Sequence, residues 1–208
     1  MSHRLEIAAS AATWIVEHGL DHAGACRKAA EHLGLAGQRG LQMPDHLEVE
    51  DAVREHLALF FADSQPLELR ALRELAAQWM RRMASFNPHL GGAVWRGTAT
   101  AQSPILLDLY TDDPTGPELE LLDQGVPFEA GQRNGRGREP VPVIGLEVHC
   151  VALQARIPIE LSVWSPEDLK GALKPDARGL RWRGTLAGLQ QLLQDDSHHE
   201  RTARTQTR

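Results

Sequence analysis

The segment that most constrains the fold is residues 91–113, GGAVWRGTATAQSPILLDLYTDD. It predicts a strand that reaches a turn at Gly97 and Thr98, followed by a second strand over 104–111. The second strand is almost entirely apolar and carries one acid, Asp108. The segment is therefore expected to form the core of a sheet, with a single carboxylate placed on it.

A helix is predicted over about 66–86, directly before this segment. Its apolar residues alternate spacings of three and four, which is typical of a core-facing helix; they are Leu69, Leu72, Ala76, Trp79, Met83 and Phe86. Asn87 and Pro88 then end the helix. The remaining pattern predicts strands over 91–100, 104–111, 126–130, 141–153 and 156–164, and helices over 117–125, 166–173 and 185–194. This order predicts the α+β class, with helices packed on one face of a small mixed sheet.

The N-terminal third is predicted to be helical, with helices over 4–18, 22–33 and 45–62. Asp21 is the expected N-cap of the second helix, and Asp45 with Glu48 has the spacing of a capping box. The domain prediction is a helical region over 1–64, an α+β domain over 65–194 and a disordered tail over 195–208. The tail is predicted to be disordered because it has almost no apolar residues.

Composition restricts the classes of function. The chain has 208 residues and a net charge of −6, which argues against broad electrostatic binding to nucleic acid. Its two cysteines, Cys26 and Cys150, are far apart and are expected to be buried thiols in a reducing compartment. Neither a secretory signal nor an apolar run of about 18 residues is visible, so the expectation is a soluble cytoplasmic protein with no membrane partner.

The order of elements around Asp108 leads to a family resemblance. The chain has a predicted helix, then a strand ending in Gly97 and Thr98, then nine residues before Asp108-Leu109-Tyr110. This order resembles the signature of the polymerase-β-type nucleotidyltransferases. That signature has a Gly followed by Gly or Ser, a spacer, Asp-x-Asp/Glu, and an acid on a later strand. Glu160, in the predicted strand RIPIELSVW, fits the later acid.

The resemblance implies transfer of a nucleoside monophosphate from a nucleoside triphosphate–Mg²⁺ complex to an unknown acceptor. Asp108 and Glu160 would be the catalytic metal ligands, because Mg²⁺ prefers carboxylate oxygens and two ions clamp the reacting oxygens. Gly97 and Thr98 would contact the triphosphate, and Arg96 would add positive charge beside it.

The chain also departs from the signature. Tyr110 stands where the second acid is expected, and a phenol is a poor ligand for Mg²⁺ at neutral pH. A second alignment, starting at Ser103, places Pro104 and Leu106 at the two acid positions. These departures motivate an alternative function, a catalytically inactive binding or regulatory module of the same fold, such as one half of a toxin–antitoxin-like pair.

Three other features leave alternatives open. Residues 4–34 are predicted to form a helix, a glycine turn and a second helix. This arrangement resembles the start of some bacterial helix-turn-helix regulators; the alternative is a plain helical hairpin. The basic segment GQRNGRGREP (131–140) holds phosphate or RNA, or is a mobile hairpin loop. The segment KGALKPDARGLRWRG (170–184) clamps a nucleotide base and its phosphates, or is a solvated loop. The first segment includes Arg133, and the second includes Trp182 and Arg183.

Overall fold

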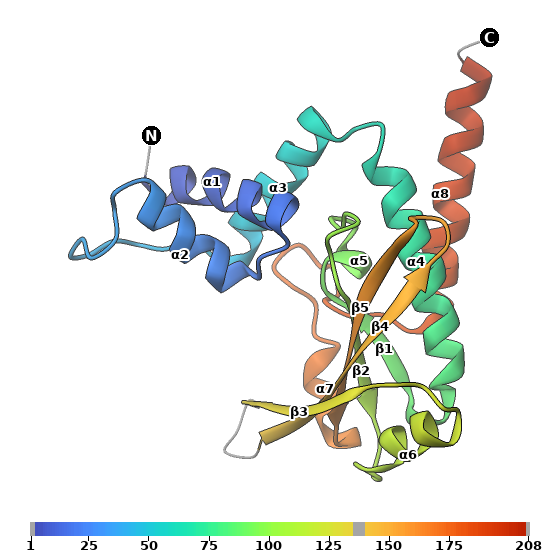
Figure 1. Cartoon of the computed structure of the whole chain (residues 1–208). Coiled ribbons are helices and arrows are strands. Elements are labelled where there is room, and N and C mark those ends of the chain that lie inside the picture. The colour runs from blue at the N-terminus through green and yellow to red at the C-terminus, as the bar shows by residue number, and fades with distance from the viewer. Residues whose placement is uncertain (1–2, 135–139, 207–208) are drawn as a thin grey trace. The chain divides into compact units, whose positions relative to one another are not determined.

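The computed structural model describes residues 3–134 and 140–206, with side chains described up to Asp196. The chain divides into two compact units (Figure 1). One unit comprises Met1–Glu68 with Thr98–Ser103, and the other comprises Leu69–Gly97 with Pro104–Arg208. We refer to them as the helical unit and the sheet unit. Among the described residues, none of the helices combines the length and apolarity that crossing a membrane requires.

The helical unit is built from α1 (His3–His18), α2 (His22–His32) and α3 (His46–Phe60), and α1 packs against both of the others. Its buried core is mostly small and aliphatic and includes Ile7, Ala11, Ala25, Ala29, Val49, Val53 and Leu57. The predicted caps are confirmed. Asp21 accepts a hydrogen bond from the Gly24 N–H, and Asp45 with Glu48 forms a complete capping box.

The start of α4 (Gln65–Arg82) and residues 98–103 also belong to this unit. The Gln65 side-chain amide donates to the carbonyl of Ala99 at 3.0 Å, and Glu68 accepts from the Ala101 N–H at 2.7 Å. These contacts attach the segment after Gly97 to the helical unit.

The sheet unit contains a five-stranded mixed sheet in the order β1-β2-β5-β4-β3. The strands are β1 (Pro88–Gly91), β2 (Ile105–Tyr110), β3 (Glu129–Asn134), β4 (Pro140–Cys150) and β5 (Ala155–Trp164). β2 and β5 pair in parallel, and the other pairs are antiparallel. The α+β prediction is confirmed: the chain is half helical and has a mixed sheet.

Short helices precede, connect and follow the strands of the sheet unit. They are α5 (Gly92–Arg96), α6 (Gly116–Asp123), α7 (Leu169–Ala172), and the single 3₁₀ turns η1 (Ala84–Phe86) and η2 (Pro166–Asp168). The chain then ends in α8 (Leu186–Gln206), which lies beside α4 in Figure 1. Arg73 of α4 holds the two helices together, because it forms an ion pair with Asp196 of α8 at 2.7 Å. Arg73 is buried, with 5% of its surface exposed, and it also donates to the Val94 carbonyl at 3.2 Å.

The two faces of the sheet differ in chemistry. Side chains alternate along a strand, so every second residue of neighbouring strands shares a face. One face is buried and aliphatic and includes Ile105, Leu107, Leu109, Ile144, Ile159 and Leu161. The opposite face, which we call the polar face, carries His89, Asp108, Glu160 and Ser162.

Two parts of the chain differ from the predicted elements. The strand predicted over 91–100 ends at Gly91, and α5 follows it, because Gly92 (φ 63°) and Gly97 (φ 82°) adopt left-handed backbone that turns the chain out of the sheet. A disordered tail is predicted from residue 195, but the backbone of α8 is helical to Gln206. The ion pair of Asp196 with Arg73 gives this helix a contact that its low apolar content does not indicate.

Candidate functional site

The structure brings Asp108 and Glu160 to the same face of neighbouring strands. In the parallel pairing of β2 with β5, Asp108 lies opposite Ser162, and Leu106 lies opposite Glu160. Since alternate residues share a face, Asp108, Glu160 and Ser162 all lie on the polar face. The two predicted acids therefore share one face of adjacent strands, offset by two residues in the register.

One arginine spans the two acids. Nη1 of Arg133, on β3, donates to Oε1 of Glu160 at 3.0 Å, and its Nη2 lies 3.8 Å from Oδ1 of Asp108. The same guanidinium lies over the ring of Trp164, 5.3 Å from the ring centroid. Arg133 therefore supplies positive charge to both carboxylates.

Both carboxylate oxygens of Asp108 accept hydrogen bonds. The indole Nε1 of Trp164 donates to Oδ1 at 2.7 Å, and Nε of Arg183 donates to Oδ2. Asp108 is buried, with 6% of its surface exposed, and Glu160 also accepts a longer hydrogen bond of 3.4 Å from the Ser162 hydroxyl. A buried carboxylate that is paired and hydrogen-bonded in this way is held in one position.

These residues, as arranged, do not fit a two-metal centre. Mg²⁺ needs a near-octahedral shell of oxygens, whereas the acid pair faces the guanidiniums of Arg133 and Arg183. Tyr110 lies in the next position along the polar face, edge-on to His89 at 5.2 Å between ring centroids. Across residues 3–134 and 140–196, no cluster of three or more His, Cys, Asp or Glu side chains is placed to hold a metal ion.

The three residues predicted to bind triphosphate are distributed differently. Arg96 is buried, pairs with Asp176 at 2.8 Å and stacks on Trp182 at 4.4 Å from the ring centroid. Gly97 ends α5, and Thr98 is buried in the helical unit. Arg96 is thus engaged in a buried ion pair of its own in the sheet unit, apart from the acid pair.

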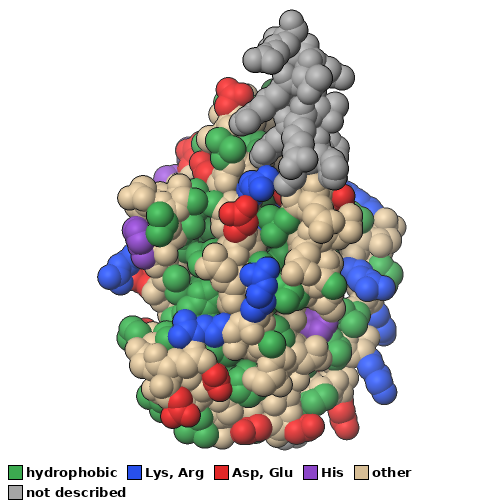
Figure 2. Space-filling view, turned by 90° about the vertical axis from the view of Figure 1, so that its right-hand side faces the viewer, with side chains coloured by type: hydrophobic (Ala, Val, Ile, Leu, Met, Phe, Trp, Pro, Cys, Tyr) green, Lys and Arg blue, Asp and Glu red, His purple; other side chains and the backbone are tan. Residues whose placement is uncertain are grey.

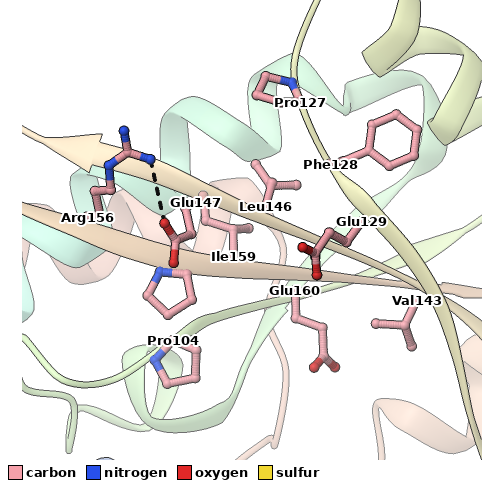
Figure 3. Close-up of a pocket in the computed structure, with 12 residues that line it drawn as sticks. Pro104, Pro127, Phe128, Glu129, Val143, Leu146, Glu147, Arg156, Ile159 and Glu160 are labelled. Atoms are coloured by element: carbon pink, nitrogen blue, oxygen red, sulfur yellow. Dashed lines mark ion pairs between the residues drawn. The ribbon is translucent and has the colours of Figure 1, made fainter.

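A pocket of about 600 Å³ adjoins the acid pair at Glu160 (Figure 3). It lies over β4 and β5, and Pro104 forms part of its wall. Pro104 occupies an acid position in the second alignment, so the pocket has an apolar ring where a metal ligand is expected. The polar lining comes from Glu129, Glu147, Glu160 and Arg156.

The partners of the acids were not identifiable from sequence. Arg133 and Arg183 belong to the two basic segments 131–140 and 170–184, whose composition predicts phosphate, RNA or nucleotide contacts or mobile loops and not partners for an acid. Residues 135–139 of the first segment lie outside the described residues. Neither segment is near Asp108 in the chain, and the residues meet because β3 and the segment before Gly184 reach the polar face. The one sequence signal in the second segment is Trp182 beside Arg183, which predicts a nucleotide clamp. In the structure Trp182 stacks on Arg96 instead.

Basic side chains do not dominate the face of the molecule shown in Figure 2, where Lys and Arg are interspersed with apolar and acidic side chains. Comparison with known proteins gave no match to any protein-family model, curated protein or solved structure.

Proposed function

We propose that this chain has a nucleotidyltransferase-like fold whose acid pair serves a binding surface and does not perform metal-dependent transfer. The observation that carries the proposal is the bridge from Arg133 to both Asp108 and Glu160. In this arrangement the positive charge that a metal ion would supply comes from the chain itself.

The energetics favour this arrangement over a metal centre. A metal ion at Asp108 would have to displace Arg133 and also replace the buried contact with Arg183. Both contacts are charge-assisted hydrogen bonds or ion pairs to Asp108, and a metal ion would have to compete with them for the same carboxylate oxygens. Mg²⁺ keeps several of its waters and is usually held by one or two carboxylates together with substrate phosphates, so at this site it would compete with two guanidiniums for the same oxygens.

The second candidate function is an active nucleotidyltransferase that moves a nucleoside monophosphate onto an unknown acceptor. It is favoured by one observation, that Asp108 and Glu160 share a face and both lie within reach of one guanidinium. In that case the two acids would hold Mg²⁺, which would neutralise the charge of the triphosphate. The toxin–antitoxin-like and DNA-binding alternatives gain no specific support from the contacts of the site.

Calorimetric titration with Mn²⁺ and ATP, together with a transfer assay using labelled nucleoside triphosphates, tests the proposal. We expect the wild-type protein to show no metal-dependent ATP affinity and no labelled product. Arg133→Ala removes the bridge, so Mn²⁺ binding that appears only in this variant would support the proposal. Wild-type binding of Mn²⁺–ATP that is lost in Glu160→Gln and kept in the control Glu167→Gln, an exposed acid of η2, would overturn it.

A further inference from the structure

The pocket beside Glu160 has a bare floor between two acids. In the strand register, Gly145 of β4 pairs with Glu129 of β3 on one side and with Glu160 of β5 on the other. These three residues share the polar face, and the glycine contributes no side chain between the two carboxylates. A Cβ built on Gly145 would find only the Glu129 carbonyl oxygen nearby, at 3.9 Å, so the floor has room for a ligand.

The walls of the pocket are flat and apolar. Pro104, Pro127, Phe128 and Val143 lie around the pocket, with Leu146 and Ile159 between the two prolines (Figure 3). Pro158 also belongs to the lining. The volume of about 600 Å³ falls within the ordinary range for small-molecule sites, about 300–1,000 Å³. Apolar walls with a few convergent charges are typical of a site for an organic ligand rather than for a bare ion.

The charge of the pocket is negative. Its lining has three glutamates, Glu129, Glu147 and Glu160, and one cation, Arg156. Arg156 is largely exposed and forms an ion pair with Glu147 at 3.6 Å, shown by the dashed line in Figure 3. Glu160 is paired in turn with Arg133, so three glutamates face two arginines and the net charge stays negative. A cleft with charge of one sign attracts ligands of the opposite sign.

Glu160 already shows which group this surface accepts, because it binds the guanidinium of Arg133. We propose that the pocket binds a small organic cation, with a guanidinium or ammonium group between Glu129 and Glu160 over Gly145 and an apolar body against the proline walls. This inference rests on the proposed function, because it names the ligand class of that binding surface. An anionic ligand such as a nucleotide would meet repulsion from the same carboxylates.

Titration of the ¹⁵N-labelled full chain with butylguanidinium tests this inference, with N-butylurea as a neutral probe of nearly the same shape. We expect butylguanidinium to bind and to shift the backbone amide signals of Gly145 and its neighbours. Binding should weaken as salt is added, since partly exposed charges are screened over about 8 Å at physiological ionic strength. N-butylurea that binds as tightly as butylguanidinium would overturn the proposal.

Two variants locate the site. Glu129→Gln removes one charge and should weaken butylguanidinium binding about tenfold, the effect of losing one hydrogen bond to a charged group. Gly145→Val places a side chain in the space between the two acids and should therefore weaken butylguanidinium binding. The strand should accept the substitution because β-branched residues suit strands. The control Glu167→Gln makes the same charge change outside the pocket, so equal affinity in Glu129→Gln and Glu167→Gln would contradict the inference.

The two proposals fail separately. Mn²⁺-dependent ATP binding by the wild-type protein would reject the proposed function, whatever the organic cation does. Absence of butylguanidinium binding would reject the ligand assignment and leave the metal question unchanged.

Discussion

The indole N–H of Trp164 donates a 2.7 Å hydrogen bond to Asp108, linking the ends of the two parallel strands β5 and β2. The two residues sit on adjacent strands and the same face, with Tyr110 directly opposite Trp164 in the register. Trp164 contacts both charged groups: its N–H donates to the carboxylate of Asp108, and its ring lies under the guanidinium of Arg133. It therefore orients both members of the carboxylate–guanidinium pair.

Trp164→Phe tests this link. Phenylalanine keeps an aromatic ring beneath Arg133 but removes the donor to a buried carboxylate. The expected loss is about 1–3 kcal/mol in the free energy of unfolding, measured with urea. In the Asp108→Asn background the same substitution should cost less, because the charged acceptor is already gone. An equal cost in both backgrounds would assign the effect to packing instead.

Gly184 is expected to tolerate no side chain. Its backbone pairs with Leu90 through two hydrogen bonds of 2.9 Å, and a Cβ would lie 1.9 Å from the ring of Trp95. The Trp95 ring cannot easily move away, because its Nε1 donates to the Arg181 carbonyl at 2.9 Å. Gly184→Ala should destabilise the chain by about 1–3 kcal/mol through overpacking.

The matched control is Gly131→Ala, on strand β3, where a Cβ meets only a carbonyl oxygen at 3.9 Å. Its urea midpoint should stay near that of the wild type. If Gly184→Ala unfolds at the same urea concentration as this control, the packing of Trp95 on Gly184 is not a constraint.

Asp176 should make stability depend on acid pH. Burial raises the pKa of Asp176, but hydrogen bonds from the Leu180 and Arg178 N–H groups and the ion pair with Arg96 outweigh it, so the pKa lies below its ordinary value. The stabilisation is therefore complete above the ordinary aspartate pKa of about 3.9 and is lost as pH falls below it toward the lowered value.

Urea midpoints between neutral and strongly acidic pH measure this effect. Asp176→Asn keeps an oxygen acceptor but loses the charge facing Arg96, so its midpoint should be lower near neutral pH and should change less on acidification. The exposed Asp112→Asn serves as the control. A pH profile of Asp176→Asn that parallels the wild type would refute the assignment.

His46 should add a second pH dependence at milder acidity. Burial lowers the pKa of His46, the positive charge of nearby His22 lowers it further, and Asp45 partly opposes them. The two imidazole rings stack with centroids 3.8 Å apart. Because the folded state favours neutral His46, its stabilisation is complete above a pH of about 6.5 and declines below it.

His46→Gln should therefore flatten the stability profile between about pH 7 and pH 5, the interval just around the ordinary histidine pKa. The exposed His32→Gln is the control and should retain the wild-type slope. NMR titration of the imidazole signals gives a direct reading, and a His46 pKa at or above that of a model peptide would contradict the prediction.

Much of the fold was predictable because its signals are local. The spacing of apolar residues gave α4, the Asp45–Glu48 pair gave the start of α3, and the aliphatic run gave β2. The short apolar run over residues 92–96 predicts a strand, but such a run suits a buried helix equally well. The deciding factor is backbone geometry at Gly92, where a Cβ would come within 2.9 Å of the Leu106 side chain.

The site was predictable only in part. The resemblance placed Asp108 and Glu160 together, and the parallel pairing of β2 with β5 does bring them to one face. The guanidiniums that engage them come from Arg133 and Arg183, in segments remote from both acids. Long-range ion pairs leave no periodic trace in a sequence, so the pairing could not be anticipated from spacing.

The strand order has a consequence for synthesis of the chain. β2 is the second of the five strands to be made, but its parallel neighbour β5 is the last. Until then one edge of β2 presents unpaired backbone groups beside Leu107 and Leu109, an arrangement prone to wrong pairing. A nascent chain that stalls before Trp164 should therefore depend on chaperones, and Asp108 and Glu160 come together on the polar face only when β5 pairs with β2.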